Sequence, residues 1–280
     1  MKKILGLFVV LILVTSCTIT EDVKISSTGE VDYTQKIDLI QMGAFTSKLT
    51  DEEKISFNQI SNQEFHYLDF LKTIIHFGSS KNIADFEKYT AYEQELSALD
   101  FLKFKLELRD NFGFEIIQRT TSVDEFNANG IIIDQVFETI KVKEDQRVAQ
   151  ELAVETDRQR KKRERKGIPS PSPMFSENPM GTFSSFQYVF DGNKFAKNVD
   201  AEKYLKAMKI DNENKEVNFL KDMLQQFKFK TKYTFPRKIK SINIDDAMFS
   251  TDGKTVVKEY NLAELYQNPK IGEFKVELED

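Results

Sequence analysis

The N-terminal leader, MKKILGLFVVLILVTSC, constrains this chain more than any other segment, because it sets the compartment in which the rest must fold. Lys2 and Lys3 give a short positive start, and residues 4–14 form an unbroken run of apolar or small side chains. This run is about 11 residues long, whereas a transmembrane helix needs about 20. A basic start, a short apolar run and a polar continuation are typical of a secretory signal peptide. We therefore predict a cleaved signal over residues 1–16.

The end of the leader resembles the lipobox of bacterial lipoproteins. Val14, Thr15 and Ser16 precede Cys17, which fits the family pattern of an aliphatic residue and two small residues before a cysteine, with Val where Leu is more common. The resemblance implies that Cys17 becomes the first residue of the mature chain and carries thioether-linked and amide-linked acyl chains, palmitate among them. Thr18 follows the cysteine where Asp would favour the inner membrane, so the resemblance implies the outer membrane.

Cys17 is the single cysteine of the 280-residue chain, so no disulfide forms within it. A lone cysteine in an exported protein calls for a specific role. Lipidation supplies one, because buried acyl chains contribute about 0.8 kcal/mol per CH₂ and two or more chains anchor a protein stably. The expected partner is thus the lipid bilayer, reached through acylated Cys17. The alternative is an ordinary cleaved signal with a chance cysteine near its end.

Composition describes the rest as a soluble globular body. A mature chain of about 260 residues suffices for one large or two small domains. Hydrophobic residues make up 40% of the chain and charged residues 30%; there are 24 Phe and no Trp. A formal net charge of −5 gives no reason to expect nucleic acid as a partner.

Apolar periodicity predicts a mixture of strands and helices. Period-two alternation and Gly-containing turns predict strands within 23–39, 101–120, 183–197, 228–235 and 239–278. Capping patterns at Thr50, Ser61 and Ser122 and apolar stripes at helical spacing predict helices near 50–58, 65–75, 122–140 and 217–227. The elements show no regular βαβ alternation. We therefore expect an α+β fold with a mainly antiparallel sheet and several amphipathic helices.

The domain organisation follows from shifts in composition, with Pro169, Pro171 and Pro173 forbidding continuation of a helix. We predict a signal peptide (1–16), a lipidated tether (17–22), an N-terminal α+β region that ends in a polar helix (23–166), a Pro-rich linker or loop (167–181) and a C-terminal strand-rich α+β region (182–280). The two regions form either one domain packed together or two.

A second resemblance rests on two short motifs. These are the Gly-turned hairpin soon after the cysteine and the Tyr-x-Phe-Pro-x-Lys-Ile-Lys-Ser element from Tyr233 to Ser241, which an Asp-Gly turn follows. The motifs resemble those of uncharacterised lipoproteins of Bacteroidetes-type bacteria and cover under a tenth of the chain. The resemblance implies a compartment and no activity.

The sharpest charge feature is a basic run at the end of the predicted polar helix. Its cations are Arg158, Arg160, Lys161, Lys162, Arg163, Arg165 and Lys166. Such a cluster attracts anionic lipid head groups. The favoured interpretation is a solvated helix end, because cations stabilise the negative end of the helix dipole. Nucleic acid would also attract the run, but an exported protein rarely meets any.

The chain carries little that points to catalysis. His66 and His76 are the only histidines, and on one helix they would lie about 15 Å apart, too far to share a metal. No Gly-x-Ser-x-Gly elbow or Gly-rich phosphate loop is present. We expect no metal and no cofactor. The leading hypothesis is a non-catalytic lipoprotein that binds an envelope component or protein partner. The alternatives are an envelope hydrolase with paired carboxylates and a structural subunit of an envelope complex.

Overall fold

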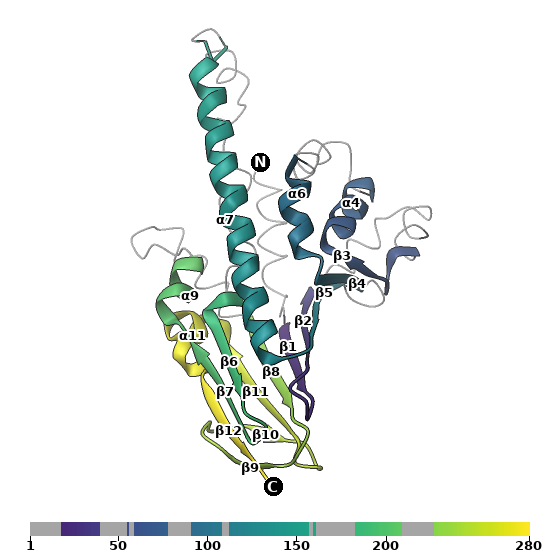
Figure 1. The fold of residues 1–280 in the computed structure, drawn as a ribbon, viewed down its shortest axis with the longest axis vertical. Helices are drawn as coiled ribbons and strands as arrows, with labels where there is room; N and C mark the ends of the chain where they lie inside the picture. Colours follow the sequence, from purple (N-terminus) through teal and green to yellow (C-terminus); the bar gives the residue numbers. More distant parts are fainter. Residues whose placement is uncertain are drawn as a thin grey trace, which may run out of the picture.

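The computed structural model describes residues 18–39, 55, 59–77, 91–107, 112–156, 159–160, 183–208 and 227–280. Helices and two mainly antiparallel sheets are mixed along this part of the chain (Figure 1), which confirms the α+β class. Several predicted features lie outside the described residues: Cys17 and the leader, most of the capping region 50–58, the linker 167–181 and nearly all of the helix 217–227.

Within the described residues, eight strands form the larger sheet, which we call sheet A. Across the sheet the order is β10 (Met248–Phe249), β11 (Thr255–Asn261), β8 (Lys228–Thr234), β1 (Thr18–Ile25), β2 (Val31–Leu39), β5 (Phe112–Thr120), β4 (Leu102–Glu107) and β3 (Glu64–His66). Every neighbouring pair is antiparallel except β1 and β8, which run parallel.

A smaller sheet, sheet B, has four antiparallel strands in the described part of the chain. Its order is β6 (Phe186–Phe190), β7 (Lys194–Val199), β12 (Phe274–Leu278) and β9 (Ile239–Ile242). The helices are α4 (Tyr67–Phe77), α6 (Glu93–Leu96), α7 (Val123–Val154), α9 (Ala201–Met208) and α11 (Leu262–Gln267), with the 3₁₀ turns η2 (Ser97–Leu99), η3 (Phe183–Ser185) and η4 (Pro269–Gly272).

Strand β1 lies inside sheet A and joins the two ends of the chain. Val23 is opposite Tyr33 of β2 on one side and Tyr233 of β8 on the other. The strand forms because Glu21, Val23 and Ile25 alternate with outward residues and are buried. The predicted tether over Thr18–Asp22 is therefore wrong: these residues are the first part of β1.

The two regions predicted from composition share both a sheet and a core. Strands β8, β11 and β10 of the second region extend the sheet begun by the first. Between the sheets lies a core to which both regions contribute: Val23, Ile25, Val31, Tyr33, Val123, Phe126, Tyr188, Phe195, Tyr233, Phe235, Val256, Phe274, Val276 and Leu278. A second core packs α4, α6 and α7 against β4 and β5. The two regions are therefore separate along the sequence but packed together in the structure.

Helix α7 begins where its capping pattern predicts and ends earlier than expected. The Ser122 hydroxyl accepts the Glu125 N–H at 3.1 Å, and the Glu125 carboxylate accepts the Thr121 N–H at 2.7 Å. The three consecutive isoleucines at 131–133, a composition also typical of strands, lie within this helix. The helix is about 48 Å long at 1.5 Å per residue, and Figure 1 shows it rising beyond the sheets. It ends because Glu155 is extended, so the predicted continuation to Lys166 is wrong.

The capping pattern at Ser61 does not start a helix. Asn62 takes a left-handed conformation with φ of 66°, and Glu64–His66 then form β3 against β4. Helix α4 begins only at Tyr67, so His66 lies in a strand and not on the predicted helix. The cross-strand pairing of Phe65 with Phe104 outweighs the local helical signal.

The edge of sheet B at β6 is covered by a side chain of α7. The Asn127 amide donates to the Tyr188 carbonyl at 2.7 Å, and its oxygen accepts the Tyr188 N–H at 3.0 Å. One carboxamide thus satisfies both backbone groups that an edge strand leaves open. Edges of this kind otherwise template pairing with another chain.

We predict that Asn127→Ala lowers the free energy of unfolding by about 1 to 3 kcal/mol, because a partly buried N–H and C=O lose their partners. Urea unfolding followed by circular dichroism measures the change. Gln135→Ala, at an exposed position of the same helix, is the control and should shift stability by less than about 0.5 kcal/mol. Equal effects of the two substitutions would contradict the role of Asn127.

Candidate functional site

The most unusual chemical group of the described structure is a buried ion pair between the two sheets. The Lys197 ammonium of β7 lies 2.7 Å from Glu21 Oε1 of β1, and the two side chains are 2% and 3% exposed. Each residue lies two positions from a buried apolar residue and on the same face of its strand: Glu21 with Val23 on β1, and Lys197 with Phe195 on β7. Period-two geometry therefore places both charges in the core. Buried charges of this kind are tolerated when they are paired.

Aromatic side chains surround the pair. The Tyr233 hydroxyl donates to Glu21, and the hydroxyls of Tyr188 and Tyr233 lie 3.5 Å apart. The Lys197 ammonium lies 4.4 Å from the ring centroid of Phe186, a cation–π contact that adds to the ion pair. The charge is thus stabilised from two sides, by a carboxylate and by ring faces.

Burial raises the pKa of Tyr33, Tyr188 and Tyr233 well above the ordinary tyrosine value, and the nearby negative charge of Glu21 raises it further. The three hydroxyls consequently stay protonated and neutral in the folded protein through the physiological range.

The pair lines a small cavity of about 50 Å³. Its walls are Glu21, Tyr33, Gln35, Phe126, Phe183, Phe186, Tyr188, Lys197, Tyr204, Phe229, Thr231, Tyr260, Leu262, Leu265 and Gly272. A cavity of this size holds a few water molecules, and pockets for drug-sized ligands measure about 300–1,000 Å³. Its single carboxylate, Glu21, is already bonded to Lys197 and Tyr233.

The histidines and the acidic side chains of the described residues form no metal cluster. Among them no three His, Cys, Asp or Glu side chains lie together as metal ligands. His66 Nδ1 contacts Asp100 Oδ1 at 2.9 Å, on an exposed part of the surface. The side chain of His76 lies outside the described residues.

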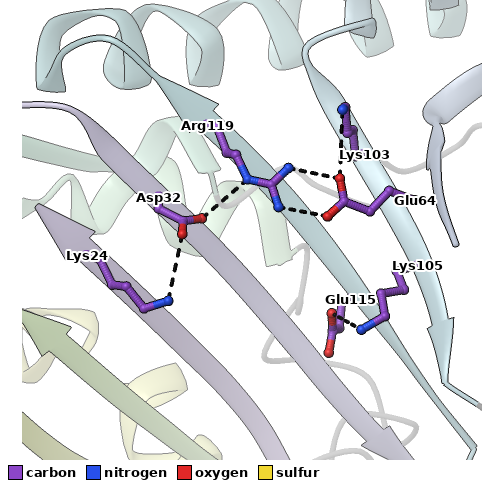
Figure 2. A network of polar contacts seen from close by, with 7 residues as sticks. All are labelled: Lys24, Asp32, Glu64, Lys103, Lys105, Glu115 and Arg119. Carbon is purple, nitrogen blue, oxygen red and sulfur yellow. Dashed lines mark hydrogen bonds and ion pairs between the residues drawn. The ribbon is translucent and has the colours of Figure 1, made fainter. Parts of the chain in front are cut away.

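The outward face of sheet A carries a network of charges that runs across its strands (Figure 2). Arg119 binds Glu64 through two hydrogen bonds of 2.9 and 2.7 Å and also approaches Asp32, which Lys24 neutralises in turn. The hydrogen bonds from Arg119 lower the pKa of Glu64, and the same contacts raise the pKa of Arg119. These charges pair with one another, which is typical of a solvated sheet face.

The basic run does not continue α7. Beyond Glu155 a new helical turn begins: the Thr156 hydroxyl accepts the Gln159 backbone N–H, and the side-chain oxygen Oε1 of Gln159 accepts the Thr156 N–H at 2.8 Å. Arg160 is exposed, with its N–H bonded to the Thr156 carbonyl. The last turn of α7 contains no basic residue, so none of these cations lies at the end of α7 itself. The other cations, Arg158, Lys161, Lys162, Arg163, Arg165 and Lys166, lie outside the described residues.

Two features were not predicted, although the sequence contains a signal for each: the break after α7 and the inward positions of Glu21 and Lys197. Thr156 and Gln159 have the spacing of a capping box, which marks the break after α7. Glu21 and Lys197 stand in phase with buried neighbours, which marks them as inward. Their mutual contact carried no signal, because they are 176 positions apart.

Comparisons with known proteins leave the family open. No family model matches this chain, and no curated protein matches it. Among solved structures it is similar to the NMR structure of the folded domain of LppM from Mycobacterium tuberculosis, with a TM-score of 0.33 and 7% identity, over 94% of this chain and 88% of that chain. A similarity this low carries no argument about fold or function. The resemblance to Bacteroidetes-type lipoproteins stays a prediction.

We predict that Lys197→Met costs about 3–5 kcal/mol of folding free energy, because it leaves the Glu21 carboxylate buried without its cation. The double variant Glu21→Gln with Lys197→Met should recover part of that loss. Lys232→Met is the control, because the Lys232–Asp22 pair at 2.9 Å is half-exposed and should contribute less than about 1 kcal/mol. Chemical denaturation measures all three. A double variant no more stable than Lys197→Met would refute the unpaired-charge explanation.

We also predict alkaline unfolding driven by the buried tyrosines. Their folded pKa lies above the unfolded value of about 10, so their contribution is complete below about pH 10 and is lost as the pH rises toward the folded value. In that window, the loss of each tyrosine's contribution lowers the free energy of unfolding by about 1.4 kcal/mol per pH unit, and the three together lower it by about 4 kcal/mol per pH unit. Tyr233→Phe should reduce the slope of unfolding free energy against pH by about 1.4 kcal/mol per pH unit. Urea unfolding between pH 8 and 11.5 measures this slope. An unchanged slope would contradict the assignment.

Proposed function

We propose that this chain is a lipid-anchored, non-catalytic binding protein of the bacterial cell envelope. The observation that carries the proposal is the leader, with its basic start, short apolar run and Cys17 at the expected cleavage point. Cleavage before Cys17 would remove residues 1–16 only, and β1 begins at the next residue after the cysteine. Lipidation at Cys17 would therefore attach the acyl chains directly to the folded body.

The outer membrane is the proposed destination, because Thr18 follows the cysteine. Among the described residues no helix is long and apolar enough to cross a bilayer. We propose the basic run 158–166 as a second contact with anionic lipid. Each cation near such a surface contributes about 1 kcal/mol, and the exposure of Arg160 is compatible with this role.

The core cavity does not fit hydrolysis by two carboxylates. Hydrolysis by two carboxylates needs a pair of groups roughly 5 to 9.5 Å apart beside a substrate cleft. The cavity instead contains one carboxylate, which Lys197 neutralises. We propose that the body binds an envelope protein or component, with the hydrolase as the alternative.

The anchor is tested by metabolic labelling with an alkyne-tagged fatty acid in a bacterial host that has an outer membrane. We expect the wild-type protein to carry the label and to fractionate with the outer membrane, and Cys17→Ser to carry none. Ser16→Ala keeps a small residue before the cysteine and should still be labelled. Mass spectrometry of the mature N-terminal peptide identifies the modified residue. An unlabelled wild-type protein with a free thiol would refute the proposal.

A further inference from the structure

Sheet B has a hollow on its outer face, opposite the face that packs on sheet A. The hollow measures about 410 Å³ and crosses all four strands. It is lined by Val189, Asp191, Lys194, Phe195, Ala196, Ser241, Ile242, Asn243, Lys275, Val276 and Glu277. Phe195 and Val276 belong to the buried core, so alternation along the strands turns their neighbours Lys194, Ala196, Lys275 and Glu277 outward.

The hollow combines an apolar floor with two lysines. Val189 is 51% exposed although it lies within β6, and Ala196 lies opposite it on β7. The ammonium groups of Lys194 and Lys275 form no ion pair with a described carboxylate, while neighbouring lysines such as Lys240 do. Among the described residues, no carboxylate therefore lies at salt-bridge distance from either ammonium group, although the charge of Lys194 helps to lower the pKa of Asp191 and of Glu277.

The nearby carboxylates are already engaged. Glu277 accepts a hydrogen bond from Lys240 at 3.0 Å, which lowers its pKa, and the charge of Lys194 contributes to that shift. Asp191 accepts the N–H groups of Asn193 and Lys194 at 2.9 and 2.7 Å, which lowers its pKa. Neither carboxylate bonds the ammonium of Lys194.

The spacing of the two lysines matches an extended peptide. Glu277 lies opposite Lys194 and Lys275 opposite Ala196, so the two lysines occupy diagonal positions on adjacent strands. Diagonal neighbours lie about 7–8 Å apart. Side chains at i and i+2 of an extended chain lie about 6.6–6.8 Å apart on one face. Four strands at a spacing of about 4.8 Å give the hollow a width of about 14 Å, enough for four residues of such a chain.

The hollow also lies at the end of the fold away from the attachment point. A Cβ on Gly29, in the turn between β1 and β2, would lie 3.9 Å from the ring of Phe190, which directly precedes Asp191. Thr18 is at the opposite end of β1, about 23 Å away for a strand of this length. A protein anchored at Cys17 would therefore leave the hollow accessible.

From these observations we infer that the outer face of sheet B docks an acidic, extended peptide segment of a partner protein, with two carboxylates two residues apart bound by Lys194 and Lys275. The inference rests on the proposed binding function and names the chemistry of the partner.

The experiment measures fluorescence anisotropy of a labelled Val-Glu-Val-Glu-Val peptide with the purified full-length mature protein in mild detergent. We expect saturable binding that weakens with salt, at least tenfold weaker binding of the Val-Gln-Val-Gln-Val peptide, and a similar loss in Lys275→Glu. Lys270→Glu, an exposed charge reversal outside the hollow, should change affinity less than twofold. Thermal unfolding confirms that both variants are folded.

Three results would overturn the inference: no saturable binding of the acidic peptide, equal losses in the Lys275 and Lys270 variants, or displacement of the peptide by free glutarate at equal concentration. The last outcome would indicate a small-molecule carboxylate site. Any of these would leave the anchor proposal standing, because acylation of Cys17 is measured separately.

Discussion

Strand β1 is hydrogen-bonded on both sides, and the architecture depends on that double pairing. Its antiparallel contact with β2 joins it to the N-terminal hairpin, and its parallel contact with β8 joins it to the C-terminal third of the chain. Without β1, sheet A would separate into β10–β11–β8 and β2–β5–β4–β3. The two compositional regions form one body because this strand lies between them.

The contact between Glu21 and Lys197 adds specificity to the packing of the two sheets. Apolar side chains tolerate sliding past one another, whereas a buried carboxylate and ammonium must meet at hydrogen-bond distance. The pair is buried beside an aromatic core that includes Phe195 and Tyr233. We regard it as a fixed point that sets how β7 faces β1, with Tyr233 completing the coordination of the carboxylate.

Local patterns along the sequence predicted the fold class, the strand pairs and the start of α7, because turns and caps are encoded within a few residues. The Asp191–Gly192 turn and the Ser122 cap are examples. The segments that were predicted wrongly depend on partners distant in the sequence. Thr18–Asp22 forms a strand because it pairs with β8, and Glu64 pairs with β4 although its local pattern suggests a helix. The core pair of Glu21 and Lys197 joins strands from distant parts of the chain, and the hollow on sheet B forms only when β6, β7, β12 and β9 assemble.

The position of β1 also has a consequence for the order of events during biogenesis. Asp22 and Lys232, which meet across β1 and β8, are 210 positions apart, and long-range contacts of this kind slow folding. A chain secreted N-terminus first would deliver its central strand long before the strand that completes the pairing. Closure of the sheet would then wait until most of the polypeptide has crossed the membrane, and a chaperone that shields β1 in the interval would suppress misassembly.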